Sequence, residues 1–237
     1  MKPPPDWLDA LPPDRLLAEF SLWSADLGGL AHDMARVEPY VDLYHIDAAD
    51  GHFSPAFLLF PDLVAALRKR TPKPLHVHIM ARDAILESQI EQFAEAGADL
   101  ISIHAENANA AQALTRIEAL GLPAGLVLQL DTPVALAAPW LERLRFLTLL
   151  GTRIGVKGQG LDASAARRLG EARALIAQRR SARRIVLAAD GGIRENTVAL
   201  LRAAGAQTIV MGSLAFNAPD LAARIAWVRA QAPSERE

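Results

Sequence analysis

Three observations on this sequence predict a single barrel of eight parallel strands and eight helices, the (β/α)8 or TIM-barrel fold. Short apolar stretches alternate with amphipathic stretches along the 237 residues, and strict alternation indicates a parallel sheet. The unit recurs eight times without a break in composition, which favours a closed barrel over an open sheet. Histidines, aspartates and glycines collect where the predicted strands end, at the edge where such barrels carry their chemistry.

The predicted strands are short and apolar, as is typical of strands that are buried on both faces. They cover residues 19–22, 43–47, 75–79, 99–104, 125–130, 146–150, 184–188 and 208–211. Amphipathic spacing predicts helices over residues 26–37, 61–70, 83–96, 108–120, 133–143, 163–180, 195–204 and 219–232. An open doubly wound sheet is the alternative, but its first turn normally carries a glycine-rich fingerprint, and Gly28-Gly29 lies beyond that turn.

Proline content marks the domain boundary. Residues 1–13 are rich in proline and predict an extended N-terminal arm, which we expect to cover one barrel end or a neighbouring subunit. Residues 14–237 are expected to form the barrel as one domain, since a chain of about 250 residues commonly folds as a single barrel.

Composition excludes several classes of function. The formal net charge of -2 offers no broad basic field, so nucleic acid is not expected as a partner. The absence of cysteine excludes disulfides, thiolate catalysis and cysteine-ligated metals. No apolar run approaches the roughly 20 residues of a membrane span, and the N-terminus lacks the apolar core of a signal peptide. We therefore expect a cytoplasmic protein with no membrane partner.

One stretch, residues 44–53, begins as a strand and ends as a loop dense in groups that ligate metals or move protons. His45 and Asp47 point the same way, because side chains alternate between the two faces of a strand. An imidazole and a carboxylate aimed together can bind a metal or act as a base and its partner. Taken alone, such a pair is more often an ordinary hydrogen-bonded pair at the surface.

The ends of other strands add ligands of the same kind. Together His45, Asp47, His78 and Asp190 form a candidate site for one divalent metal ion. Two imidazoles and two carboxylates suit Zn²⁺, Fe²⁺, Mn²⁺ or Co²⁺ and do not choose among them. A single strand histidine such as His78 is more often a hydrogen-bonded core residue. His76 points the same way as His78, and we expect it to be structural rather than an outer partner of the metal.

Three glycine-rich segments follow the last three predicted strands: residues 155–160, Gly191-Gly192 and Gly212-Ser213. Glycine lets backbone N–H groups approach an anion closely, and the loops after strands seven and eight form the usual phosphate site of these barrels. Tight turns alone are the alternative. The pairing of Gly191-Gly192 with Gly212-Ser213 in neighbouring loops favours phosphate binding.

The chain resembles the ribulose-phosphate 3-epimerase family over residues 21–219, nearly its whole length. Six motifs carry the resemblance in order and spacing: Ser21-Leu22-Trp23-Ser24-Ala25-Asp26, His45-Ile46-Asp47 with Asp50-Gly51-His52-Phe53, His76-Val77-His78-Ile79-Met80, Gly155 with Gly158-Gln159, Asp190-Gly191-Gly192-Ile193 and Met211-Gly212-Ser213.

The resemblance implies a (β/α)8 barrel that epimerises a ketose phosphate, an isomerase of carbohydrate metabolism. It implies a divalent metal on His45, Asp47, His78 and Asp190, with Asp47 and Asp190 as the acid and base. It implies that substrate is contacted by Ser21, Met80, Gly155, Gly158 and Gln159, and that phosphate is held by Gly191, Gly192, Gly212 and Ser213. It also implies a homo-oligomer.

The chain departs from the family pattern around the sugar. Ala49 and Leu150 stand where the family usually has methionines that line the substrate. Arg153 and Lys157 lie in a loop that usually reads close to Asn-Pro-Gly-Phe-Gly-Gly-Gln, and His76 stands where the family usually has aspartate. The reaction type is therefore expected to be retained, while ribulose 5-phosphate is not expected to be the best substrate.

Other functions on the same barrel are weighed against this reading. A Schiff-base aldolase needs a lysine at a strand end, and Lys157 is the sole candidate, in a loop. The keto-acid sugar-phosphate decarboxylases expect Asp-x-Lys at the second strand, where this chain has Asp47-Ala48-Ala49. A non-catalytic barrel that binds metal or sugar phosphate is the third alternative, and the intact Asp47 and Asp190 argue against it.

Overall fold

The strands close into a barrel, as the alternation of apolar and amphipathic stretches predicts. The structure is a computed structural model and describes residues 1–179 and 183–233. Within that part of the chain, eight parallel strands follow one another around the barrel in sequence order. They are β1 Leu17–Ser21, β2 Leu43–Ala49, β3 Leu75–Met80, β4 Leu100–His104, β5 Ala124–Leu128, β6 Leu144–Leu150, β7 Val186–Asp190 and β8 Thr208–Met211. The last strand pairs with the first, with Phe20 opposite Met211.

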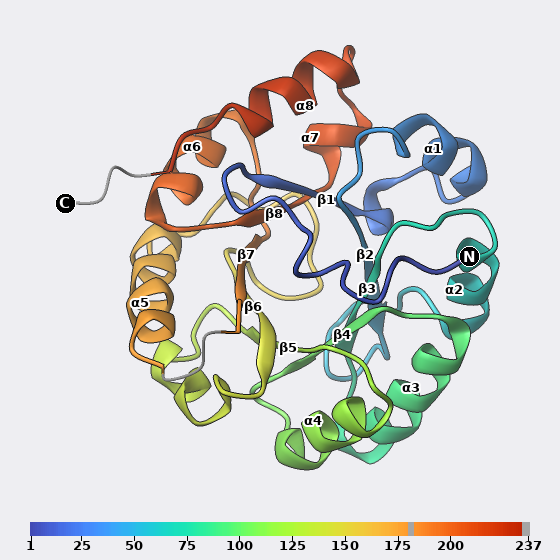
Figure 1. Ribbon diagram of the computed structural model, residues 1–237, viewed down its shortest axis with the longest axis vertical. Coiled ribbons are helices and arrows are strands. Elements are labelled where there is room, and N and C mark those ends of the chain that lie inside the picture. Colours follow the sequence, from blue (N-terminus) through green and yellow to red (C-terminus); the bar gives the residue numbers. More distant parts are fainter. Residues whose placement is uncertain (180–182, 234–237) are drawn as a thin grey trace.

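Helices surround the barrel (Figure 1). The α-helices are α1 Leu30–Val37, α2 Pro61–Arg68, α3 Asp83–Ala96, α4 Ala110–Ala119, α5 Ala165–Ala177, α6 Glu195–Ala204, α7 Ser213–Phe216 and α8 Leu221–Arg229. Two 3₁₀ helices complete the set, η1 Leu22–Ser24 and η2 Val134–Trp140. None of the described helices is long and apolar enough to cross a membrane.

Several predicted boundaries are wrong for local reasons. The helix expected from residue 26 begins at Leu30, because the Asp26 carboxylate accepts the Gly28 N–H at 3.0 Å and holds a turn there. The stretch 133–143 forms a 3₁₀ helix, since Pro139 lies inside it and lacks an N–H. The seventh strand lies two residues later than expected, and Asp190 is its last residue.

Other boundaries differ at element ends. The first strand starts at Leu17 rather than at residue 19. The final helix covers Leu221–Arg229 of the predicted 219–232, and the four-residue helix α7 was not expected. Residue 180, the end of the helix predicted over 163–180, and residues 234–237 of the expected barrel domain lie outside the described residues.

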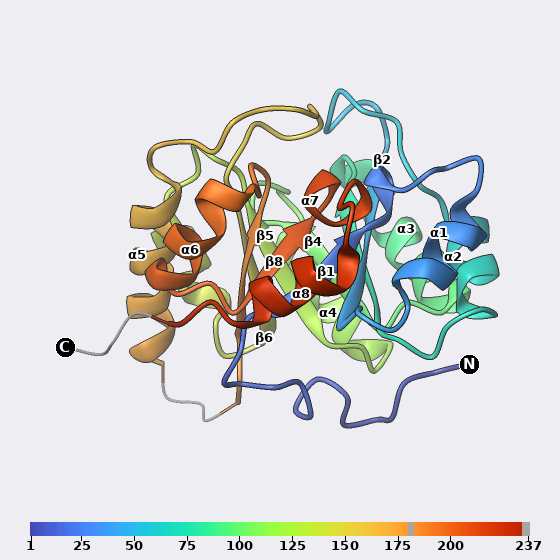
Figure 2. The same ribbon diagram turned by 90° about the horizontal axis from the view of Figure 1, so that it is seen from above.

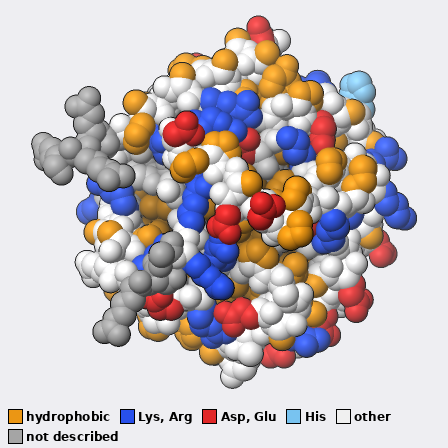
Figure 3. All heavy atoms as spheres, viewed as in Figure 1, with side chains coloured by type: hydrophobic (Ala, Val, Ile, Leu, Met, Phe, Trp, Pro, Cys, Tyr) orange, Lys and Arg blue, Asp and Glu red, His pale blue; other side chains and the backbone are white. Residues whose placement is uncertain are grey.

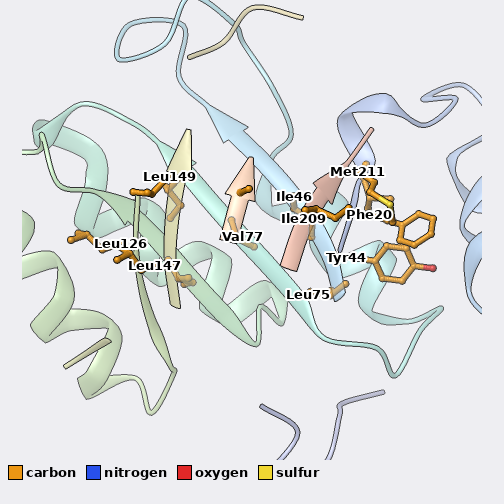
Figure 4. Packing of buried hydrophobic residues seen from close by; sticks show 14 of the residues in the cluster. Phe20, Tyr44, Ile46, Leu75, Val77, Leu126, Leu147, Leu149, Ile209 and Met211 are labelled. Carbon is orange, nitrogen blue, oxygen red and sulfur yellow. The ribbon is translucent and has the colours of Figure 1, made fainter. Parts of the chain in front are cut away.

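The main hydrophobic core lies between the strands and the helices. Alternate strand residues face outward into it, as Figure 4 shows for Phe20, Tyr44 and Met211 on three neighbouring strands. The residues between them, such as Glu19 and His45, face into the barrel. Because one face of each strand is committed to the helices, the inward face is free to carry polar groups.

The N-terminal end of the barrel is closed by residues 1–13. A second apolar cluster joins Trp7, Leu8 and Leu11 of this arm to the lower inward residues of the barrel, Leu17, Leu43, Leu100, Phe146, Val186 and Ala188. Figure 2 shows the arm at one end of the barrel, with the loops after β2 and β6 at the other. The closed end leaves the opposite, C-terminal end of the strands for a site.

Candidate active site

A cavity of about 290 Å³ lies at the C-terminal end of the strands. Its lining includes Asp47, His78 and Asp190 from three strands, together with the loops that follow β1, β6, β7 and β8. The sequence placed its candidate residues at these strand ends. The structure brings most of them together in the lining of this one cavity.

Two imidazoles and two carboxylates converge on one point beside this cavity. His45 and Asp47 come from β2, His78 from β3 and Asp190 from β7. One nitrogen or oxygen of each lies within 4.8 Å of the corresponding atoms of the other three. His45 Nε2 is 3.2 Å from Asp47 Oδ1, and His78 Nδ1 is 3.4 Å from the same oxygen.

The two inward nitrogens support a cation at this point. Within the described residues, His45 Nε2 and His78 Nδ1 are buried and have no hydrogen-bond partner. A buried polar atom without a partner is costly unless something else satisfies it. Two nitrogen lone pairs aimed at two carboxylates form a donor set that suits a first-row divalent metal. The residues present therefore fit the metal that the sequence predicts.

Outer residues fix which nitrogen of each histidine faces inward. His45 Nδ1 lies 2.7 Å from Glu19 Oε1 and donates its proton to that carboxylate. His78 Nε2 lies 2.9 Å from His104 Nε2, and His104 Nδ1 lies 3.0 Å from Glu106 Oε2. A histidine that donates through one nitrogen presents the lone pair of the other, which is how such partners prepare metal ligands.

The surroundings shift the pKa values of the two carboxyl groups that face the cavity in opposite directions. Although burial favours its neutral form, the imidazoles of His45 and His78 hold the pKa of Asp47 far below its usual range. Burial raises the pKa of Asp190 to about 6, and the nearby charge of Asp47 adds to this shift. Opposite shifts in one pair are the usual mark of a base and an acid.

The local field also favours positive charge at the metal position. Burial disfavours a charged imidazole, but Asp47 and Glu19 outweigh it and raise the pKa of His45 well above its usual range. Burial likewise opposes ionisation of Glu19, yet His76 and His45 lower the pKa of that carboxyl to about 2. Anionic groups that stabilise an imidazolium also stabilise a bound cation.

The expected substrate residues occupy different positions around the cavity. Ser21 and Met80 line it, and the Ser21 hydroxyl donates to Asp47 Oδ2 at 2.8 Å. Gly155 and Gly158 also line it, both with positive φ. Gln159 lines it too, but its side-chain amide donates to the carbonyls of its own loop at Arg153 and Val156, which braces the loop.

The loop after β6 covers the cavity. A Cβ at Gly155 would lie 2.8 Å from Pro55 Cδ and still closer to Ser54 Oγ, so this loop packs closely on the loop after β2 (Figure 2). Lys157 Nζ donates to the Trp23 carbonyl at 2.6 Å and lies 4.7 Å from the centre of the Trp23 ring. Partial burial lowers the pKa of Lys157, and the Asp47 carboxylate opposes that shift.

The glycines after β7 and β8 lie side by side along one wall of the cavity. Gly191, Gly192, Gly212 and Ser213 all line it, and the two glycines after β7 have positive φ. A Cβ at Gly212 would collide with Ser24 Oγ, so the hydroxyl of Ser24 lies against this loop. The wall thus combines the backbone of two glycine turns with the hydroxyls of Ser24 and Ser213, a surface suited to an anion.

The departures from the family pattern fall in two places. Leu150, Arg153 and Lys157 line the cavity itself. Ala49 is buried and His76 is fully enclosed in the barrel beneath the cavity. His76 donates to Glu19, at 2.6 Å between Nδ1 and Oε1. Relative to the family pattern, this chain therefore differs both in the wall of the cavity and in the polar layer below it.

Sequence reasoning missed several residues that the structure brings to the site or directly beneath it. Trp23, Ser24 and Arg194 line the cavity, and Glu19 holds His45 from below. Trp23 and Ser24 lie inside the first motif and could have been found from it. Glu19 gave a weaker signal: it is two residues before Ser21, on the same face of a predicted strand.

Comparisons with solved structures agree with the barrel fold. A solved structure titled 3-hexulose-6-phosphate synthase superposes with a TM-score of 0.66 at 17% identity, covering 92% of this chain and 100% of that one. Orotidine 5'-phosphate decarboxylase from Pyrococcus horikoshii OT3 gives a TM-score of 0.64 at 15% identity, with 90% and 97% covered. At these identities the likeness supports the fold alone.

Sequence relatives go further. Ribulose-phosphate 3-epimerase of Bacillus subtilis (strain 168) is 32% identical over 211 residues, which span 88% of this chain and 96% of the relative. Ribulose-phosphate 3-epimerase of Synechocystis sp. is 35% identical over 214 residues, with 88% and 91% covered. A sequence profile described as the Ribulose-phosphate 3 epimerase family matches residues 17–216. The chain belongs to the ribulose-phosphate 3-epimerase family.

Proposed function

We propose that this protein is a metal-dependent isomerase that inverts the carbon next to the ketone of a ketose phosphate. One observation carries the proposal: two carboxylates with opposite pKa shifts and two imidazoles meet at one point beside a single cavity. Membership of the ribulose-phosphate 3-epimerase family supports the same reaction type. Curated relatives with that name are matched over nearly their whole length.

The proposed metal ligands are His45, Asp47, His78 and Asp190. A divalent ion held there would act as a Lewis acid on negative charge that develops on the substrate oxygens. Zinc, iron, manganese and cobalt all suit the donor set. Glu19 and His104 orient the two imidazoles by taking up their outer nitrogens in hydrogen bonds.

Asp47 and Asp190 are proposed to move the protons. Epimerisation requires that a proton leave one face of the carbon and that another arrive on the opposite face, through an enediolate. Asp190 has a pKa of about 6, near neutral pH, and is suited to exchange a proton in either direction, while Asp47 stays ionised beside the imidazoles and is free to accept one. Their strands, β2 and β7, are three steps apart around the barrel, so they reach the substrate from different sides.

The phosphate of the substrate is proposed to bind along Gly191, Gly192, Gly212 and Ser213. Backbone amides at these two turns and the hydroxyl of Ser24 offer hydrogen bonds to phosphate oxygens. Ser21, Met80, Gly155, Gly158 and Gln159 then surround the sugar portion, with Gln159 acting through the shape of its loop.

We propose further that the best substrate is a ketose phosphate other than ribulose 5-phosphate. Leu150 replaces a methionine in the cavity wall, and Arg153 and Lys157 add positive charge to the loop above it. Lys157 lies close enough to Asp47 to interact with it electrostatically. A sugar of different length, or one with an added anionic group, fits this wall.

A panel of four-, five- and six-carbon ketose phosphates, with NMR detection of the epimer, tests both statements. Specificity is compared through kcat/KM. No epimer from any member of the panel, with metal-replete enzyme, would refute the reaction type. A maximum at ribulose 5-phosphate would refute only the refinement. Borohydride treatment during turnover should trap no adduct, since trapping on Lys157 would indicate a Schiff-base enzyme.

Lys157→Gln identifies the role of the charge in the loop. The substitution should raise KM for the best substrate more than for ribulose 5-phosphate, because only the best substrate uses the added cation. Lys69→Gln, at the exposed end of α2, is the matched control and should change neither value. Equal effects of Lys157→Gln on the KM values of the two substrates would show that this lysine does not contribute to substrate specificity.

Metal content is measured on protein purified without chelator. We expect about one divalent ion per chain, and removal by chelator should abolish turnover. Full activity in demonstrably metal-free protein would contradict the metal assignment. A cytoplasmic location and a homo-oligomeric state complete the proposal. Both follow from the reading of the sequence and can be examined by fractionation and by light scattering.

A further inference from the structure

A buried polar layer lies inside the barrel directly below the metal ligands. Its members are Glu19, His45, His76 and Ser102, and all four side chains are 0% exposed. Barrels of this class usually fill such layers with branched apolar side chains. A carboxylate and two imidazoles in that position require an explanation, because buried ionisable groups are costly unless each is fully paired.

The layer is one continuous chain of hydrogen bonds that starts at a metal ligand. Glu19 Oε1 accepts from His45 Nδ1 at 2.7 Å and from His76 Nδ1 at 2.6 Å. His76 Nε2 is 2.6 Å from Ser102 Oγ. If both histidines carry their proton on Nδ1, every step is satisfied, since Ser102 then donates to His76 Nε2. The same arrangement leaves His45 Nε2 with a free lone pair toward Asp47 and Asp190.

The backbone makes room for this chain. A Cβ added at Gly125 on β5 would overlap Ser102 Oγ and lie 3.3 Å from Phe146 Cβ. A larger residue at position 125 would therefore push Ser102 away from His76. On the far side, Glu19 Oε2 lies 3.4 Å from Thr208 Oγ1 on β8. Residues from strands β1, β2, β3 and β4 thus form the chain of hydrogen bonds. Gly125 on β5 leaves space for it, and Thr208 on β8 contacts its Glu19 end.

We propose that Glu19, backed by His76 and Ser102, is the positioning residue that fixes His45 as a metal ligand. The proposal rests on the metal site of the proposed function. The family usually has an aspartate at the position of His76. In this chain the carboxylate comes instead from β1, and His76 links it to Ser102. Loss of such an outer partner typically weakens metal binding about 10- to 100-fold.

Glu19→Gln tests the proposal with Co²⁺ as the probe. The amide keeps the size of Glu19 but cannot accept from both histidines through one charged oxygen. Co²⁺ affinity is measured on the full chain by competition with a chromophoric chelator, and its visible spectrum reports coordination geometry. We expect about 10- to 100-fold weaker binding and an altered spectrum.

Glu38→Gln is the matched control. Glu38 also accepts two side-chain hydrogen bonds, from Tyr44 Oη at 2.6 Å and from Thr71 Oγ1 at 2.7 Å, but it touches no metal ligand. This variant should lose stability and keep both the Co²⁺ affinity and the spectrum of the parent. A purely structural role for Glu19 would give the same pattern as Glu38→Gln.

Ser102→Ala keeps the test decisive if Glu19→Gln fails to fold. It removes the far end of the chain of hydrogen bonds and creates only a small void, and we expect about 10-fold weaker Co²⁺ binding, the lower end of the range for outer partners. Folded Glu19→Gln, or in its absence Ser102→Ala, with parental affinity and spectrum would overturn the proposal. A parent that binds Co²⁺ without epimerising any ketose phosphate would refute the proposed function and leave this inference standing.

Discussion

Asp47 and Asp190 carry the same carboxyl group, and their surroundings move the two pKa values in opposite directions. Asp47 is buried between His45 and His78 and accepts the Ser21 hydroxyl, so its charged form is stabilised. Asp190 lies beside the same charges without an equivalent set of donors, and burial raises its pKa to about 6. At the scale of single residues, environment rather than residue type separates the pKa values of these two proposed acid–base groups.

Asparagine at either position should separate the two half-reactions. Asp47→Asn and Asp190→Asn each remove one proton acceptor, and net epimerisation should fall about 10²- to 10⁴-fold in both. The remaining carboxylate can still exchange a proton on its own face. Each variant is therefore expected to exchange solvent deuterium into one epimer, with the two variants choosing opposite epimers by NMR.

Metal content must accompany that experiment, because both residues are also proposed ligands. A metal-replete variant that epimerises at near the parental rate would contradict the assignment of two acid–base groups. Exchange into the same epimer by both variants would contradict the division of faces.

The residue scale also shows what sequence alone could supply. His45, Asp47, His78 and Asp190 were predicted together because strand alternation and chain order place them at one barrel end. Their contact within 4.8 Å matches that expectation. The side-chain bracing of Gln159 and the support of His45 by Glu19 could not be predicted, since both depend on rotamers and on packing across strands.

At the scale of elements, the turn between β7 and α6 depends on glycine for space as well as for conformation. Gly192 has φ +71, and a Cβ there would lie 2.7 Å from Leu161 Cα and 2.8 Å from Leu161 N. Because both neighbours are backbone atoms, they cannot rotate away. The turn therefore packs directly on the segment that leads from β6 into α5, and the two cavity walls are coupled.

Gly192→Ala should destabilise the protein by about 3 kcal/mol, as the sum of left-handed strain and overpacking. It should also raise KM, because the segment that carries the proposed phosphate amides must shift. Urea unfolding and steady-state kinetics measure the two effects.

Gly160→Ala is the control in the same region. No atom lies within 4 Å of a Cβ there, so stability should change by less than about 0.5 kcal/mol. Equal stability of the two variants would show that the turn does not depend on close packing.

Helices and strands were predicted well where the hydrophobic spacing is regular. Their ends were predicted poorly where a local turn replaces the first or last turn of a helix. The strands alternated as expected because parallel strands buried on both faces must be apolar. The helix expected from residue 26 starts later, at Leu30, because Asp26 binds the Gly28 amide, and the helix expected over 133–143 is a shorter 3₁₀ helix because of Pro139. These outcomes depend on local hydrogen bonds that hydrophobic spacing does not encode.

At the scale of the whole molecule, the N-terminal arm seals one barrel end. Trp7, Leu8 and Leu11 are at most 9% exposed and pack on inward residues of five strands. Lys2 binds the carbonyls of Gly97 and Ala98 at 3.2 and 3.1 Å. The face that carries the arm shows acidic, basic and apolar side chains intermingled (Figure 3). Sealing this end leaves the opposite end of the barrel, where the proposed active site lies, open to solvent.

Leu8→Ala should therefore cost about 2–4 kcal/mol of unfolding free energy, as for a leucine in a main core. Metal affinity and kcat should not change, since the site lies at the opposite end of the barrel. Leu136→Ala, at a leucine that is 45% exposed, is the control and should cost less than about 1 kcal/mol. Unfolding of Leu8→Ala at the parental urea concentration would show that the arm contributes no stability.

The ends of the chain are joined at Asp42, in the turn before β2. Its carboxylate accepts from Arg15 Nη1 and Nη2, both at 2.7 Å, and from the Ala18 N–H at 2.9 Å. Arg229, the last residue of α8, adds a contact at 3.4 Å. Burial opposes ionisation, but Arg15 and the Ala18 amide outweigh it and lower the pKa of Asp42. One carboxylate thus links the first strand, the second strand and the final helix.

Asp42→Asn should make the unfolding free energy of the protein depend less on pH in the acid range. The lowered pKa means that the unfolded chain binds a proton more readily than the folded one, so this stabilisation is complete above the unfolded value near 4. It is lost as pH falls through the lower folded value. The variant should be about 2 kcal/mol less stable at pH 7, and the difference should shrink progressively below about pH 4.

Urea unfolding at a series of pH values measures this difference, with Glu87→Gln on the exposed face of α3 as control. A difference between Asp42→Asn and the parent that stays constant down to the acid limit would show that the Asp42 charge does not link the chain ends.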